Sequence, residues 1–168
     1  MKVFGIAGRS GSGKTTLLEQ LLPRFKARGL TVSIIKHTHH GFDIDKPGKD
    51  SWRHREAGAQ EVMLACNARW ALMRELRDEP EPDLNALLAR LAPCDLVLVE
   101  GFKQEPVPKL EVYRPAWGQP PLYPERADIS AVATDAVLDT RLPCLPLNEP
   151  EVIVQFIISH LNLQESPC

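Results

Sequence analysis

The chain has 168 residues, with 20 lysines and arginines against 22 aspartates and glutamates and a formal net charge of −2. This length suits one domain with a substantial core. The balanced charge, without a basic stripe, argues against nucleic-acid binding. No apolar run is long enough to span a bilayer, so no membrane segment is expected. We expect no N-terminal targeting signal, and four cysteines without paired C-x-x-C spacing indicate free thiols in a reducing cytoplasm.

The first expected element is a short buried strand, Lys2–Ala7, which leads into the glycine-rich sequence GRSGSGKTT. Apolar residues then recur at helical spacing over 17–25, and Gly29 is placed to end that helix. Between the two elements, the segment Gly8–Thr15 fits the phosphate-binding loop pattern in its strand–loop–helix context. The sequence therefore predicts a phosphate site at its N-terminal end.

The residue types of this loop suit a bound phosphate. Glycines permit backbone angles closed to other residues, and inward N–H groups at a helix N-terminus attract an anion. Lys14 would reach the β- and γ-phosphates of a nucleotide, and the Thr15 hydroxyl would ligate Mg²⁺. The predicted nucleotide-binding residues here are Gly8, Arg9, Ser10, Gly11, Ser12, Gly13, Lys14, Thr15 and Thr16.

A second buried strand is expected at Leu30–Lys36. A helix between two apolar strands predicts a parallel sheet, and the polar sequence KHTHH after the strand should line the ligand crevice. Its histidines, His37, His39 and His40, invite a metal interpretation. They alternate along the strand direction, however, without a carboxylate or thiol at ligand spacing, so a dedicated metal site is the weaker alternative.

Asp50 precedes a short helix expected at Trp52–Gly58. One interpretation makes Asp50 the N-cap of that helix. The other places its carboxylate near Mg²⁺ or the γ-phosphate, where nucleotide-sensing loops lie. Both stay open, and Asp50 joins the candidate catalytic and metal residues.

Two apolar runs, 60–66 and 69–73, are split by the dipeptide Asn67-Ala68 and predict an antiparallel hairpin within 60–75. One interpretation makes this hairpin an antiparallel edge of the parallel sheet. Asp83 should then cap a helix with its apolar face at Leu84, Leu87, Leu88 and Leu91.

The run Asp95–Glu100 is a further buried strand that ends in an acid. In phosphate-loop proteins an acid at this strand end holds the Mg²⁺ shell. Glu100 is therefore a candidate catalytic and metal residue, acting through a metal-bound water or on the attacking water. An exposed strand-end acid is the simpler alternative.

Two more strands are expected at Lys109–Tyr113 and Ile129–Thr134, followed by a final helix. Asp135 follows the second strand, and its carboxylate could accept from the N1–H and 2-amino group of guanine. The fold class is thus α/β: a P-loop NTPase with a mostly parallel twisted sheet flanked by helices. We expect one nucleotide-binding domain over 1–163 and a loose tail at 164–168.

The motifs taken together also resemble a known family. In order along the chain, GRSGSGKTTLLEQLLP, KHTHHGFDIDKPGKDS, ARWALM, DLVLVEGFK and AVATD resemble the B protein of molybdopterin-guanine dinucleotide biosynthesis. The resemblance covers nearly the whole chain, and its second and fourth motifs are far more specific than the phosphate loop. It implies a GTP-binding adapter with weak, Mg²⁺-dependent GTPase activity.

The same resemblance implies a homodimer that works beside the molybdenum cofactor guanylyltransferase, which joins GMP to molybdopterin. Direct binding of molybdopterin is left open. The resemblance places GTP on the segment Arg9–Thr16 and Mg²⁺ near Thr15 and Glu100. It places Asp50 and His37–His40 at the same crevice.

Two other functions stay open. In a small-molecule kinase of the uridine-kinase type, Asp50 would be the base, Arg53 and Arg55 would hold phosphate, and an arginine-rich lid would be expected. In a metal-delivery GTPase, the histidines of KHTHH would carry the metal ion.

Overall fold

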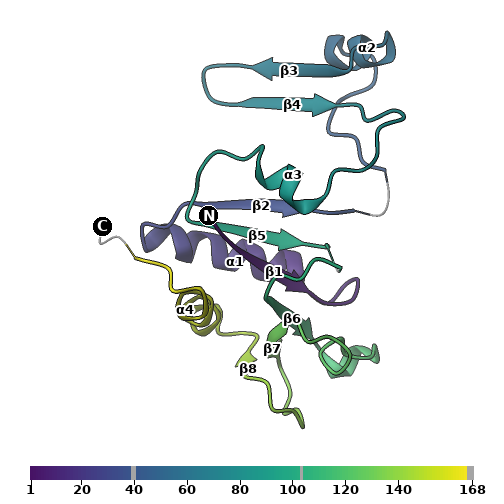
Figure 1. The fold of residues 1–168 in the computed structure, drawn as a ribbon. Helices are drawn as coiled ribbons and strands as arrows, with labels where there is room; N and C mark the ends of the chain where they lie inside the picture. Colours follow the sequence, from purple (N-terminus) through teal and green to yellow (C-terminus); the bar gives the residue numbers. More distant parts are fainter. Residues whose placement is uncertain (39–40, 103, 166–168) are drawn as a thin grey trace. The chain divides into compact units, whose positions relative to one another are not determined.

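The computed structural model describes residues 1–38, 41–102 and 104–165 (Figure 1). They form two compact units, one made of Met1–His37 together with the chain from Leu87 onward, and the other of Thr38–Ala86. Within the described residues, no helix has both the length and the hydrophobicity needed to cross a bilayer. The single domain 1–163 stays a prediction, and residues 166–168 of the expected tail lie outside the described residues.

The first unit is built on a six-stranded parallel sheet in the order β2-β5-β1-β6-β7-β8. Its strands are β1 (Lys2–Ala7), β2 (Val32–Lys36), β5 (Leu96–Glu100), β6 (Lys109–Tyr113), β7 (Ile129–Thr134) and β8 (Cys144–Pro146). Its helices are α1 (Lys14–Ala27), α4 (Pro150–Leu161) and the 3₁₀ turn η1 (Pro115–Trp117), while α3 (Leu84–Leu88) spans the boundary between the units. This confirms the predicted mostly parallel α/β fold.

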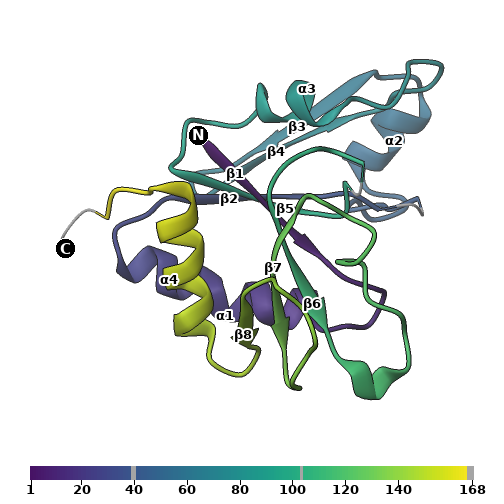
Figure 2. The ribbon, with the colours of Figure 1, turned by 60° about the horizontal axis from the view of Figure 1, so that its bottom comes forward.

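Helices α1 and α4 lie side by side over the sheet (Figure 2). Side chains alternate across a strand, so every second residue of the central strands points to these helices. The core they share includes Phe4, Ile6, Leu21, Phe25, Leu98, Leu110, Val112, Ala131, Ile153 and Ile157. This apolar layer holds the strand ends, and hence the loops that follow them, in register.

A buried lysine, Lys109 at the start of β6, is 2 % exposed. Its ammonium donates to the carbonyl oxygens of Glu105 and Val107 and pairs with the carboxylate of Asp128. Its stem lies over Gly5 of β1, where a β-carbon would stand 2.5 Å from the lysine Cγ. Glycine is therefore needed in the middle of β1 because the lysine occupies the space of a side chain.

We expect this cluster to make the stability of the protein acid-sensitive. Burial alone would raise the pKa of Asp128, but hydrogen bonds from Arg126 and Lys109 outweigh it and lower the pKa from 3.8 to about 2. A carboxylate with a depressed pKa stabilises the fold above its unfolded pKa and loses that effect as pH falls toward its folded pKa. The contribution, about 2 kcal/mol, should be complete at pH 6 and vanish between pH 4 and pH 2.

Urea unfolding of the wild type and Asp128→Asn at pH 6, 4 and 2 measures this loss. The stability difference between the two proteins should shrink toward zero over that window. A difference that stays constant to pH 2 would contradict the assignment.

The second unit contains α2 (Asp50–Glu56) and a hairpin of β3 (Glu61–Ala65) and β4 (Trp70–Arg74). The turn is closed by the Cys66 N–H donating to the Arg69 carbonyl, at 2.9 Å, so the hairpin predicted around Asn67-Ala68 is confirmed. Its interpretation as an edge of the parallel sheet is wrong, since β3 and β4 form a separate two-stranded sheet. The hairpin exposes the apolar side chains Met63, Leu64, Trp70 and Leu72.

Candidate nucleotide-binding site

The loop between β1 and α1 has the conformation that its glycines predict. The φ angles of Gly8, Gly11 and Gly13 are 139°, 80° and 98°. A β-carbon on Gly8 would lie 2.6 Å from the carbonyl oxygen of Val112 on β6. Both the backbone angle and the close neighbour therefore require glycine there. The loop closes through the Ser12 N–H, which donates to the Arg9 carbonyl at 3.2 Å.

Lys14 is the first residue of α1, and its ammonium turns back onto the loop. It donates to the carbonyl oxygens of Gly8 at 3.1 Å and Arg9 at 2.9 Å. Thr15 and Thr16 lie exposed in the same first turn. The first N–H groups of a helix have no acceptor within the helix, so a cation, two hydroxyls and a helix N-terminus converge on one place. This combination suits a phosphate.

Glu100 ends β5, the strand next to β1, and is mostly buried. Its carboxylate lies 3.5 Å from the Lys36 ammonium at the end of β2. Parallel strands end at the same sheet edge, so Glu100 and the phosphate loop share that edge. The simpler alternative of an exposed strand-end acid is wrong, because Glu100 is 8 % exposed.

The turn after Glu100 is tightly built. Gly101 has φ 102°, and a β-carbon on it would stand 2.7 Å from Cβ of His37. The His37 ring packs on Phe102 with ring centroids 4.9 Å apart. Among the described residues, no group of three His, Cys, Asp or Glu side chains could hold a metal ion. His39 and His40 of the metal interpretation lie outside the described residues.

On the other side of β1, the ends of β6 and β7 carry an ion pair. Arg114 Nη1 donates to Asp135 Oδ2 at 2.8 Å, and the Arg114 guanidinium lies 5.8 Å from the centroid of the Trp117 ring. Asp135 thus lies at the predicted strand end, with one oxygen engaged. The sequence does not predict Arg114 and Trp117 as site residues, because the tetrapeptide RPAW indicates no more than a turn.

Asp50 lies in the second unit, as the first residue of α2, and Lys49 takes the N-cap position. The N-cap interpretation of Asp50 is therefore wrong. Its side chain is 90 % exposed and stands 3.9 Å from Arg53. Its assignment to catalysis or to Mg²⁺ stays a prediction.

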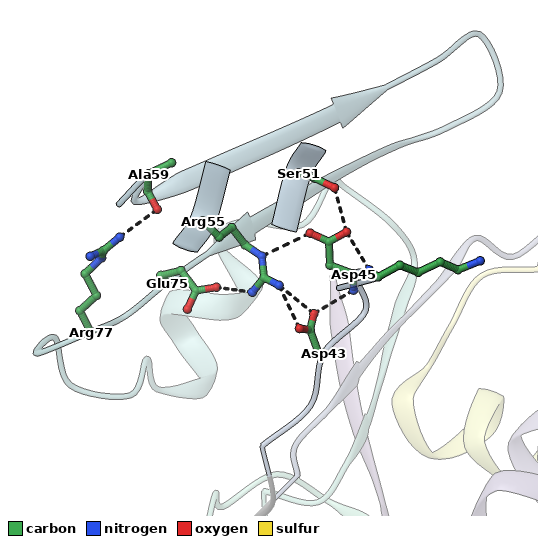
Figure 3. Close-up of polar contacts among 8 residues, drawn as sticks. Asp43, Asp45, Ser51, Arg55, Ala59, Glu75 and Arg77 are labelled. Atoms are coloured by element: carbon green, nitrogen blue, oxygen red, sulfur yellow. Dashed lines mark hydrogen bonds and ion pairs between the residues drawn. The ribbon is translucent and has the colours of Figure 1, made fainter. Parts of the chain in front are cut away.

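The more tightly held group in this unit is Arg55 (Figure 3). Its guanidinium donates to Glu75 at 2.6 Å, to both oxygens of Asp43 at 2.9 and 3.0 Å, and to Asp45 at 3.4 Å. Asp45 also accepts from the Ser51 hydroxyl at 2.8 Å. Hydrogen bonds to Glu75 and Asp43 raise the pKa of Arg55. The backbone N–H of Asp45, and then Arg55, lower the pKa of Asp43. Asp43 and Asp45 thus hold their loop against the guanidinium of Arg55.

A parallel sheet in this strand order, with a glycine-rich loop running from β1 into a helix that begins Lys-Thr, defines a phosphate-loop nucleotide-binding fold. Residues 3–135 match the model of the family described as molybdopterin guanine dinucleotide synthesis protein B. The chain belongs to this family.

Curated relatives and a solved structure agree with this placement. The molybdopterin-guanine dinucleotide biosynthesis adapter protein of Escherichia coli is 43 % identical over 96 % of this chain and 94 % of its own length. Its counterpart of the same name in Haemophilus influenzae is 46 % identical over 95 % and 89 %. A crystal structure of molybdopterin-guanine biosynthesis protein B superposes with a TM-score of 0.76 at 30 % identity, covering 95 % of this chain and 99 % of that one.

Proposed function

We propose that this chain binds GTP with Mg²⁺ and acts as an adapter in the attachment of GMP to molybdopterin. Relatives that span nearly the whole chain carry the name of adapter proteins in molybdopterin-guanine dinucleotide biosynthesis, which supports the adapter role. The observation that carries the nucleotide part is the Gly8–Thr15 loop, with its left-handed glycines and the Lys14 ammonium held at its carbonyls.

The residues present fit a magnesium nucleotide. Mg²⁺ is held by one or two carboxylates, hydroxyls and substrate phosphates, and Thr15 and Glu100 supply such oxygens at the ends of adjacent elements. When bound, the ion would neutralise charge on the phosphates. Lys14 binds the β- and γ-phosphates, the loop N–H groups orient them, and Glu100 orients the attacking water. Asp50 is a further proposed member of this set.

Hydrolysis should be slow. The sequence marks no obvious glutamine to orient the attacking water. Arg9 in the phosphate loop, which could act as an arginine finger, donates to the Pro120 carbonyl at 3.2 Å. Positioned phosphates and Mg²⁺ alone give weak turnover. A turnover number above about 1 s⁻¹ without a partner, the low end for kinases, would contradict an adapter role.

The arginine contacts weigh against the kinase alternative. Arg55 is engaged with three carboxylates, Arg74 pairs with Glu61 and Glu79, and Arg77 donates to the Ala59 carbonyl. These side chains hold their own unit together rather than forming a lid over a substrate phosphate. A screen of nucleosides and sugars should show phosphate transfer to water alone.

We further propose a homodimer that binds the molybdenum cofactor guanylyltransferase. The name of the relatives, adapter proteins in molybdopterin-guanine dinucleotide biosynthesis, supports a protein partner. The exposed apolar side chains of the hairpin support protein contacts. Sedimentation of the chain alone should give twice the monomer mass of 18.8 kDa. Adding the guanylyltransferase should give a larger species.

Calorimetric titration with GTP and ATP, each with and without Mg²⁺, tests the nucleotide assignment. We expect saturable binding of GTP, tighter with Mg²⁺ and tighter than ATP. If neither GTP nor ATP produces heat of binding, the proposal is overturned.

Glu100→Gln tests the role of this carboxylate. We expect GTP hydrolysis to fall about a hundredfold or more, within the range for a positioned base, while GTP affinity changes far less. Lys36→Gln is the matched control, because it removes the ion pair at 3.5 Å and keeps the carboxylate. Single-turnover hydrolysis measures the rate. An unchanged rate in Glu100→Gln would make this residue structural.

A further inference from the structure

The segment after β6, residues 114–123, packs against the phosphate loop. The Trp117 ring lies 3.3 Å from the position of a β-carbon on Gly11. Arg9 Nε donates to the Pro120 carbonyl at 3.2 Å. The loop and this segment also line a common pocket. The segment therefore forms a wall beside the phosphate loop.

A buried carboxylate fixes this wall in place. Glu111 on β6 is 1 % exposed, and its two oxygens accept from the backbone N–H groups of Leu122 and Tyr123 at 2.7 and 2.8 Å. Desolvation raises the pKa of Glu111. Both carboxylate oxygens are engaged in holding the segment. Glu111 is therefore a positioning residue.

The strand order sets the direction in which a nucleotide must lie. Glu100 ends β5 on one side of β1, while Arg114 and Asp135 follow β6 and β7 on the other side. If Glu100 and Thr15 mark the Mg²⁺ end of the triphosphate, the nucleoside extends toward β6 and β7. The base then meets Trp117, Arg114 and Asp135.

The region around Arg114, Trp117 and Asp135, called the corner below, has hydrogen-bonding groups without partners in the described part of the chain and a solvent-exposed aromatic ring. Among the described residues, Arg114 Nε and Ser12 Oγ are buried without a hydrogen-bond partner. Trp117 is 53 % exposed. Asp135 accepts from Arg114 through one oxygen, and a carboxylate has about four acceptor sites. The corner thus offers donors, acceptors and a stacking surface together.

We infer that Trp117, Arg114 and Asp135 form the guanine-recognition subsite of the chain, an inference that rests on the proposed binding of GTP. The indole of Trp117 stacks with the base. Asp135 accepts from N1–H and the 2-amino group, and Arg114 orients that carboxylate and donates toward O6. Adenine has an amino group at position 6 and no donor at N1. Arg114 would therefore face a donor and Asp135 an acceptor, which disfavours the binding of adenine.

The test separates base binding from phosphate binding. Calorimetry measures the affinity of the whole chain for Mg·GTP, Mg·ATP and Mg·tripolyphosphate. Trp117→Ala should weaken GTP about tenfold or more, as stacking contacts do, and leave tripolyphosphate within about twofold. Arg114→Gln and Asp135→Asn should each abolish the preference for GTP over ATP.

Matched variants control for structure. Trp117→Phe keeps an aromatic ring and should retain most affinity for GTP. Trp70→Ala removes an exposed tryptophan of the hairpin and should leave the affinities for GTP and tripolyphosphate unchanged. As a second readout, Trp52→Phe/Trp70→Phe leaves Trp117 as the one tryptophan. Its fluorescence should be quenched by GTP and not by tripolyphosphate.

Each other outcome has a definite meaning. Equal loss of GTP and tripolyphosphate in Trp117→Ala would make Trp117 a support of the loop and overturn the subsite. Unchanged GTP affinity, or a Trp117 signal unmoved by saturating GTP, would also overturn it. If the wild type binds neither GTP nor tripolyphosphate, the proposed function itself fails.

Discussion

Replacing Lys14 with alanine should abolish tight nucleotide binding. The ammonium lies at the mouth of the loop, 3.1 and 2.9 Å from two loop carbonyls, and would contact the β- and γ-phosphates. A hydrogen bond to a charged group contributes about 1.5–3 kcal/mol, and this cation makes more than one. We expect GTP affinity to fall about a hundredfold or more, measured by calorimetry with Mg²⁺.

The fold should tolerate this change. Lys14 begins a helix, and alanine is the best helix former, so thermal stability without nucleotide should be nearly unchanged. Lys26→Ala, in the exposed last turn of the same helix, removes an equal charge far from the loop and should bind GTP normally. Wild-type affinity in Lys14→Ala would refute the assigned contact.

Lys109→Met should have the largest effect on stability. The substitution leaves the Glu105 and Val107 carbonyls without the buried ammonium and removes one hydrogen-bond partner of the Asp128 carboxylate. Breaking a buried pair by removing one partner costs about 3–5 kcal/mol. Urea unfolding at neutral pH measures the loss. Lys2→Met, exposed at the start of β1, is the control for losing a strand lysine.

The pair also predicts a rescue. Each single variant leaves one charge of the Lys109–Asp128 pair without its partner, and the double variant leaves neither. Lys109→Met/Asp128→Asn should therefore be less destabilised than the sum of its two single variants. Strict additivity, or a loss below about 1 kcal/mol for Lys109→Met, would mean that the buried ammonium contributes little, as some buried pairs do.

Local patterns were enough for the elements with strong periodicity. The strands at 109–113 and 129–134 lie where the apolar runs predict them, and the hairpin turns at Asn67-Ala68. Asp83 caps α3 by accepting from the Ala86 N–H at 2.7 Å. The helix is shorter than its leucine pattern predicts, however, and ends at Leu88.

Other elements had no local signal. Strand β8 is three residues long and lies beside prolines, which are poor strand formers. It exists because it pairs with β7, with the Val132 N–H donating to the Pro143 carbonyl at 2.9 Å. Pairing of this kind depends on residues distant in sequence, so no window of the sequence predicts it.

The candidate site divides in the same way. The Gly8–Thr15 loop is contiguous, and its chemistry follows from residue types that only a phosphate cradle needs in that order. The surroundings of the loop are assembled from separate strands. Arg114 meets Asp135, Lys36 meets Glu100, and the segment after β6 meets the loop, because parallel strands bring their ends to one edge.

The amino-acid sequence by itself thus determined the α/β class, the phosphate loop and the family, because each depends on residues close together or on motifs in fixed order. The tertiary structure alone decided that Glu100 is buried, that Arg55 is held by carboxylates, and that Trp117 and Arg114 lie against the loop. The physical reason is that burial and ion pairing depend on which distant segments the sheet brings into contact, and local propensity carries no information about that.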